Sequence, residues 1–158
     1  MLIIAPEDLG IADGMFRNHR SPCRLLGPLE SRRDIWRANM ANDKIYGMHF
    51  SKVFPLLIAK AERKGRTKEE VYEITEWLTG YNGDSIDNAL ASEMTYGEFF
   101  TNAPALNPDR RLIKGAICGI KVEEIEEPLM QEIRYLDKLV DELAKGKPLE
   151  KIKRQKCL

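Results

Sequence analysis

The stretch IEEPLMQEIRYLDKLVDELAKG, residues 125–146, indicates the fold most strongly. Its apolar residues recur in steps of four, four, three, four and three positions, which places them on one face of an α-helix. Pro128 suits the first turn of this helix, and Gly146 followed by Pro148 ends it. The apolar seam consists of Ile125, Leu129, Ile133, Leu136, Val140 and Leu143.

Two interpretations of this seam are open. An amphipathic helix usually packs its apolar face on its own domain, and near-heptad spacing also suits pairing with a helix of another chain. The second interpretation predicts a homodimer formed through Leu129, Ile133, Leu136, Val140 and Leu143.

Two more helices precede this one. Apolar residues from Phe54 to Ala61 repeat with helical spacing. Because proline is tolerated only in the first turn of a helix, Pro55 predicts that this helix starts within a few residues before it. Thr67 and Glu70 form a capping box, which predicts a helix over about 68–79. Its inward face is Val71, Ile74 and Leu78.

Shorter elements fill the chain between these helices. A cap at Asp84 or Ser85, a capping box at Thr95 and Glu98, and Asn107 before Pro108 each predict a helix start. Residues 117–122 fit either a helical continuation or a short extended segment. We therefore expect an all-α, single-domain bundle of five or six helices.

Composition excludes several classes of protein. The 158 residues carry 25 Lys plus Arg and 25 Asp plus Glu, so no net charge attracts nucleic acid or an anionic membrane. The longest apolar runs are a few residues, too short to cross a bilayer. Three widely spaced cysteines and two histidines fit neither a disulfide framework nor a structural zinc site. We expect a cytoplasmic protein without a cofactor or metal.

Residues 1–39 differ from the rest of the chain. All 13 lysines follow residue 40, whereas residues 1–39 contain six arginines and no sustained apolar period. We expect this segment to be a disordered or spurious N-terminal extension, with Met40 as the native start and residues 40–158 as the domain.

Several strings resemble those of a known family. They include KAERKGRTKEEV (residues 60–71), WLTGY (residues 77–81) and IRYLDKLVDEL (residues 133–143). Together they resemble the bacterial family known as domain of unknown function 2200, over about residues 44–154. The resemblance implies a small bacterial cytoplasmic protein and supplies no activity or catalytic residues.

Candidate functional residues are few. His49 is the histidine of the predicted domain and could transfer protons, although a surface or capping role explains it as well. Cys118 is expected to be a buried thiol. The cluster of Glu123, Glu124, Glu126 and Glu127 could bind a cation, but glutamates at a helix start are usually solvated. No catalytic set emerges, and the candidate binding residues are Tyr46, His49, Trp77, Tyr81, Arg134, Tyr135 and Asp137.

These observations favour a noncatalytic binding or interaction module. One alternative is a DNA-binding regulator, because two segments, around Gly115 to Ile125 and Gly80 to Ile86, have spacings like those of a helix-turn-helix. Both segments carry acidic residues where DNA contacts need cations. The other alternative is a small enzyme that uses His49 or the acidic cluster.

Overall fold

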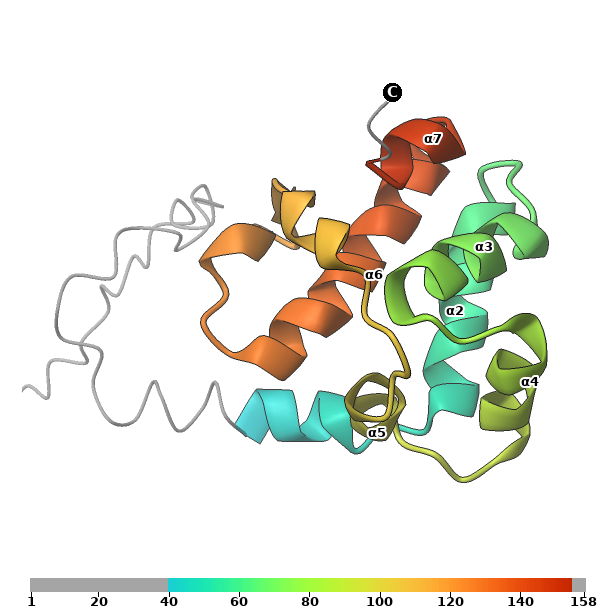
Figure 1. Ribbon diagram of the computed structural model, residues 1–158, viewed down its shortest axis with the longest axis vertical. Helices are drawn as coiled ribbons and strands as arrows, with labels where there is room; N and C mark the ends of the chain where they lie inside the picture. Colours follow the sequence, from blue (N-terminus) through green and yellow to red (C-terminus); the bar gives the residue numbers. More distant parts are fainter. Residues whose placement is uncertain (1–39, 155–158) are drawn as a thin grey trace, which may run out of the picture. The chain divides into compact units, whose positions relative to one another are not determined.

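The computed structural model describes residues 40–154, and the predicted N-terminal extension lies outside them. Helices dominate the described residues, as predicted, and the small sheet has two strands (Figure 1). Residues 40–46 are helical. The elements that follow are α2 (Phe50–Glu62), α3 (Lys68–Thr79), α4 (Gly83–Ala91), α5 (Tyr96–Thr101), η1 (Pro108–Leu112), β1 (Ala116–Ile117), β2 (Ile120–Lys121), η2 (Val122–Glu124), α6 (Pro128–Ala144) and α7 (Leu149–Ile152).

Side-chain caps fix where the helices start. The hydroxyl of Thr67 accepts from the backbone N–H of Glu70, and Glu70 accepts in return from Thr67, so the predicted capping box begins α3. Thr95 and Glu98 do the same at α5. Asn82, rather than Asp84 or Ser85, caps α4.

Helix α2 differs from its prediction at Pro55. The helix begins at Phe50, so Pro55 lies in its second turn and not in the first. Proline has no N–H to offer the carbonyl of Ser51. Pro55 is exposed, so this part of the helix faces water, which can bond the freed carbonyl.

Helix α6 is the centre of the packing. It contacts α2, α3, α5, α7, η2 and β1 (Figure 1). Four residues of the predicted seam, Ile133, Leu136, Val140 and Leu143, are at most 1% exposed, and Leu129 is half-buried. The seam therefore belongs to the protein's own core. The prediction that these side chains form a homodimer interface is corrected, because intramolecular contacts already cover them; self-association itself stays a prediction.

Aromatic rings from α2 and α5 fill the core beside α6. The ring centroids of Phe50 and Phe99 are 4.0 Å apart in a stacked pair, and Phe54 stacks on Phe50 at 4.9 Å. Tyr96 packs edge-on against Phe100. The Phe50–Phe99 stack joins α2 to α5, which are separated along the chain by α3 and α4.

The ambiguous segment near residues 117–122 is extended. Strands β1 and β2 form a two-residue hairpin that pairs Ala116 with Lys121 and Ile117 with Ile120. The turn residues Cys118 and Gly119 both have positive φ, 52° and 80°, as a type I′ turn requires. This hairpin is not a helix-turn-helix, so the helix-turn-helix predicted around residues 115–125 is wrong.

Arginines tie the end of α6 to the rest of the fold. Arg66, between α2 and α3, donates from Nε to the carbonyl of Leu143 at 3.1 Å and so caps the end of α6. Arg154 forms two hydrogen bonds with the buried carboxylate of Glu142, at 2.8 and 3.0 Å.

No helix among the described residues is long and apolar enough to cross a membrane.

Candidate functional site

The predicted residue Tyr46 lies beside the start of α6. Its hydroxyl donates to Oε1 of Glu127, and Asn42 donates to Oε2 of the same carboxylate at 2.6 Å. Burial, followed by the hydrogen bond and charge of Glu127, raises the pKa of Tyr46 well above its ordinary value. Both oxygens of Glu127 thus anchor the first helix to α6, and the tyrosine stays neutral at physiological pH.

Arg134 and Asp137 lie on the same side of α6 as an ion pair. Nη1 of Arg134 is 3.0 Å from Oδ2 of Asp137, and both side chains are mostly buried. Burial raises the pKa of Asp137 even though Arg134 opposes this shift. One turn further along, Asp141 pairs with Lys60 of α2 at 3.2 Å.

Tyr96 completes this polar cluster, although sequence reasoning did not select it. The residue is 2% exposed, and its hydroxyl has no hydrogen-bond partner among the described residues. Burial, followed by the charge of Asp137, raises its pKa well above its ordinary value. The cluster lies in the packing between α5 and α6. Its residues therefore contribute to the stability of the fold and do not form an open ligand-binding surface.

His49 lies close to Tyr46 along the chain but has another role. It is the N-cap residue of α2, and its backbone bridges to Thr95 just before α5. Its side chain is half-buried and makes no capping bond. The structure therefore assigns the backbone of His49 to joining α2 and α5.

The remaining predicted binding residues lie apart from these. Tyr81 stacks on Phe99 with centroids 4.6 Å apart, and its hydroxyl donates to the Phe99 carbonyl at 3.1 Å. Trp77 is half-buried against the core, and Tyr135 is buried on α6. The seven candidates do not form one site.

The acidic cluster at residues 123–127 is divided among separate partners. Glu123 accepts from the backbone N–H of Gly115 at 2.9 Å, and Glu124 pairs with Lys121 at 2.6 Å. Glu127 receives Asn42 and Tyr46 as described above. Among residues 40–154, no group of three or more acidic, histidine or cysteine side chains could hold a metal ion. The expected buried thiol of Cys118 is also wrong, because Cys118 is exposed at the hairpin tip.

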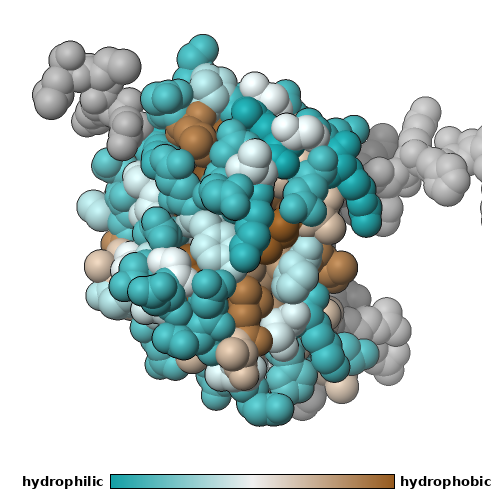
Figure 2. Space-filling view, turned by 90° about the vertical axis from the view of Figure 1, so that its right-hand side faces the viewer, coloured by the Kyte–Doolittle hydropathy of each residue, from teal (hydrophilic) through white to brown (hydrophobic). Residues whose placement is uncertain are grey.

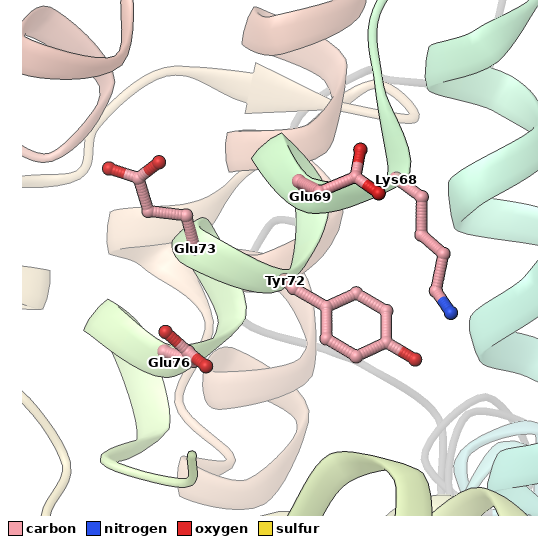
Figure 3. Close-up of a pocket in the computed structure, with 5 residues that line it drawn as sticks. All are labelled: Lys68, Glu69, Tyr72, Glu73 and Glu76. Carbon is pink, nitrogen blue, oxygen red and sulfur yellow. The ribbon is translucent and has the colours of Figure 1, made fainter. Parts of the chain in front are cut away.

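A surface that the sequence analysis did not select is the outer face of α3. Glu69, Glu73 and Glu76 lie on successive turns of this face and, with Lys68 and Tyr72, line an open hollow of about 410 Å³ (Figure 3). The hydroxyl of Tyr72 donates to Asp87 of α4 at 2.7 Å. Burial, followed by Asp87, raises the pKa of Tyr72, so its ring remains a neutral wall of the hollow.

Acidic residues outnumber cations around this hollow, where Lys68 is the lining cation. Between residues 69 and 109 the sequence has nine acidic residues and no Lys, Arg or His. Among the described residues, two of the nine have ion pairs: Glu70 with Arg66, and Glu73 with Lys153. The signal was present in the sequence as a segment free of cations, but the overall balance of charge concealed it. The acids without an ion pair are Glu69, Glu76, Asp84, Asp87, Glu93, Glu98 and Asp109.

The side of the molecule on which α3 and α4 lie is mainly hydrophilic. Figure 2 shows this side, with hydrophobic residues confined to a narrow band and a spot near one end.

The acidic residues of α4 argue against the second helix-turn-helix candidate. Helices α3 and α4 are joined by residues 80–82, but α4 contains Asp84 and Asp87 and no cation. This helix would repel phosphates rather than bind them.

The fold and its surfaces define a small all-α domain. The chain belongs to the family of uncharacterised proteins conserved in bacteria (DUF2200), which matches residues 44–154. The resemblance stated from the sequence is confirmed, and the family description names no activity.

One solved structure is similar to this chain. It is the crystal structure of the uncharacterised protein SP1917, which is 52% identical, with a TM-score of 0.67. The similarity covers 69% of this chain and 89% of that one. No curated protein matches the chain.

Proposed function

We propose that this protein is a noncatalytic interaction module that docks a cationic segment of a partner protein on the outer face of α3. The observation that carries the proposal is the row of Glu69, Glu73 and Glu76 around an open hollow, at the start of a segment, residues 69–109, without any cation. Glu73 pairs with Lys153, whereas Glu69 and Glu76 have no ion pair among the described residues. Unpaired charge of one sign on a surface favours a ligand of opposite charge.

The hollow also contains a surface suited to an ammonium group. Nζ of Lys68 lies 4.7 Å from the centroid of the Tyr72 ring, on the ring face. A cation over an aromatic face is attracted by the ring's quadrupole. A partner lysine or arginine can use the same ring while neighbouring carboxylates neutralise its charge, and Lys68 then turns to solvent.

A cytoplasmic location fits this role and is part of the proposal. Cys118 is free and exposed at the tip of the hairpin. Reducing compartments keep such thiols free, whereas secreted proteins usually pair them.

The proposal is tested by binding of a fluorescent peptide that alternates lysine with leucine, followed by anisotropy. Replacing Glu69, Glu73 and Glu76 together by Gln removes the charged row, and we expect affinity to fall about tenfold. The matched control replaces Glu62, Glu126 and Glu150 by Gln. These three are exposed and have no ion pair among the described residues, so the change in net charge is identical.

We expect the control to change affinity less than about twofold. Equal losses in both variants would show a general charge effect and contradict a site on α3. A peptide that does not bind the wild-type protein at low salt would contradict the proposed function itself.

A further inference from the structure

The outer face of α2 has an apolar residue that the fold leaves uncovered. Phe50, Phe54 and Ala61 of this helix are buried. Leu56 is 63% exposed, and Pro55 beside it is exposed as well. Residues 53–59 are all apolar, so this helix carries more apolar surface than its own core uses.

Cations flank Leu56 on this face. Lys52 and Arg63 are exposed and have no ion pair among residues 40–154. Positions 52, 56 and 63 lie on one side of a helix, because four and seven residues are close to whole turns. The outer face of α2, continued by its C-cap residue Arg63, is therefore a stripe of cation, leucine and cation.

This stripe complements the surface of α3. Helix α2 has 13 residues and α3 has 12, so each is roughly 18–20 Å long. The α3 face presents Glu69 and Glu76 near the two ends of a hollow that Tyr72 lines. A leucine flanked by cations is complementary in charge to a hollow bordered by Glu69 and Glu76, provided that Lys68, which also lines the hollow, turns to solvent.

We propose that a second copy of this chain docks the outer face of its α2 on the outer face of α3. The proposal rests on the proposed function of the α3 surface and names its partner. Leu56 of the second copy enters the hollow beside Tyr72, while Lys52 and Arg63 meet the surrounding carboxylates.

The two faces point in different directions within one molecule. The ring of Phe54 contacts Tyr72 of α3, and Leu56 follows two residues later. Two residues turn a helix by about 200°, so Leu56 points away from α3. The contact is therefore head-to-tail, and it builds open chains or a ring rather than a two-fold dimer.

The test is sedimentation velocity of the full chain from about 10 µM to 1 mM, the range expected for a small interface. The mean mass of the wild type increases with concentration and decreases when salt is raised. One variant carries Lys52→Glu with Arg63→Glu, and a second carries Glu69→Lys with Glu76→Lys. Each stays monomeric alone, because its changed face repels the unchanged one.

Mixing the two variants restores association. In the mixture, the acidic α2 face of the first variant meets the basic α3 face of the second, and the basic α2 face of the second meets the acidic α3 face of the first. Both contacts join opposite charges. Circular dichroism of each variant confirms that it is folded. Leu56→Ser weakens association at least fivefold, and Leu112→Ser, at an exposed leucine outside α2 and α3, leaves it unchanged.

Other results overturn the proposal. A wild-type protein that stays monomeric over the whole range shows that the partner is not a second copy, whether or not α3 binds the cationic peptide. Association that both charge variants retain shows that copies meet through another surface. Peptide binding is measured at low protein concentration, so its failure is detected separately from failure of self-association.

Discussion

Tyr96 carries a buried hydroxyl that has no hydrogen-bond partner within residues 40–154 to offset its desolvation. Replacing Tyr96 by Phe removes the polar atom and keeps the ring that packs on Phe50 and Phe100. We expect the free energy of unfolding to stay constant or to rise by up to about 1 kcal/mol. Urea unfolding measures this difference.

Tyr81 supplies the matched control for this experiment. Its hydroxyl donates to the Phe99 carbonyl, so Tyr81→Phe should lower the free energy of unfolding by about 1 kcal/mol. A similar loss in Tyr96→Phe would reveal a bonding partner for the Tyr96 hydroxyl and would refute the assignment of an orphaned group.

Among residues 40–154, Glu142 is the most completely buried charged residue, at 3% exposed. Burial tends to raise the pKa of its carboxyl, but hydrogen bonds from Arg154 and Lys147 outweigh burial and lower it. A carboxylate whose pKa is lowered by folding stabilises the protein above its unfolded pKa, and this stabilisation is lost as the pH falls through the folded pKa.

We therefore expect Glu142→Gln to lower the free energy of unfolding by about 2 kcal/mol at pH 7, because the bonds to two cations weaken. The difference from wild type should shrink as the pH decreases below about 4.3. Urea unfolding at a series of pH values tests this, and a difference that is independent of pH would contradict it.

At the scale of the element, Gly80 decides how α3 ends. It has φ = 77°, and a Cβ there would lie 2.8 Å from both the Cβ and the carbonyl oxygen of Ala105. Gly65 after α2 has almost the same φ, 76°, but open space around it. Comparing alanine substitutions at these two glycines therefore separates the cost of a positive φ from the cost of a steric clash.

Gly65→Ala should lower stability by about 1 kcal/mol, because alanine disfavours positive φ. Gly80→Ala should lower it by about 3 kcal/mol, because the backbone of residue 105 must also move. Thermal unfolding of both variants measures the gap. Equal losses would show that the contact with Ala105 relaxes freely.

The hairpin turn offers a change that should increase stability. Cys118 has φ = 52°, a conformation that Asn tolerates better than other non-glycine residues. Asn followed by Gly is the preferred pair for a type I′ turn. We expect Cys118→Asn to raise the free energy of unfolding by about 0.5 kcal/mol and Cys118→Val to lower it. A Cys118→Asn variant that melts earlier than wild type would contradict this account.

At the scale of the whole molecule, the separation of charge predicts weak interaction with DNA. Residues 69–109, which hold α4, α5 and all of α3 except its first residue Lys68, contain no cation, although the full chain is electrically balanced. We expect no measurable shift of labelled duplex DNA at about 150 mM salt with micromolar protein. A salt-dependent shift at that concentration would revive the DNA-binding alternative.

Much of this fold could be predicted from the sequence, because its signals are local. The capping boxes at Thr67 and Thr95, the periodicity of residues 125–146 and the glycine after α3 each act within a few residues. Pro55 was misjudged because a proline in a second turn is tolerated where solvent bonds the freed carbonyl. The exposure of Cys118 was misjudged because a two-residue turn is too short to show a pattern of alternating apolar and polar residues.

The candidate site was harder to predict than the fold. Tyr46 and Tyr96 contact α6 across 40 to 80 residues of chain, and no local pattern encodes such a meeting. The acidic face of α3 depends on which residues remain unpaired after Arg66 and Lys153 have found their partners. That information exists only in the assembled molecule.

The central position of α6 has a consequence for synthesis on the ribosome. Helices α2, α3 and α5 all pack on a helix that is translated after them. Until residue 144 has left the exit tunnel, Phe50, Phe54 and Leu78 have no complete core to enter. The nascent chain therefore keeps these apolar residues exposed until α6 has been translated, a period in which chaperones that bind apolar segments have access to them.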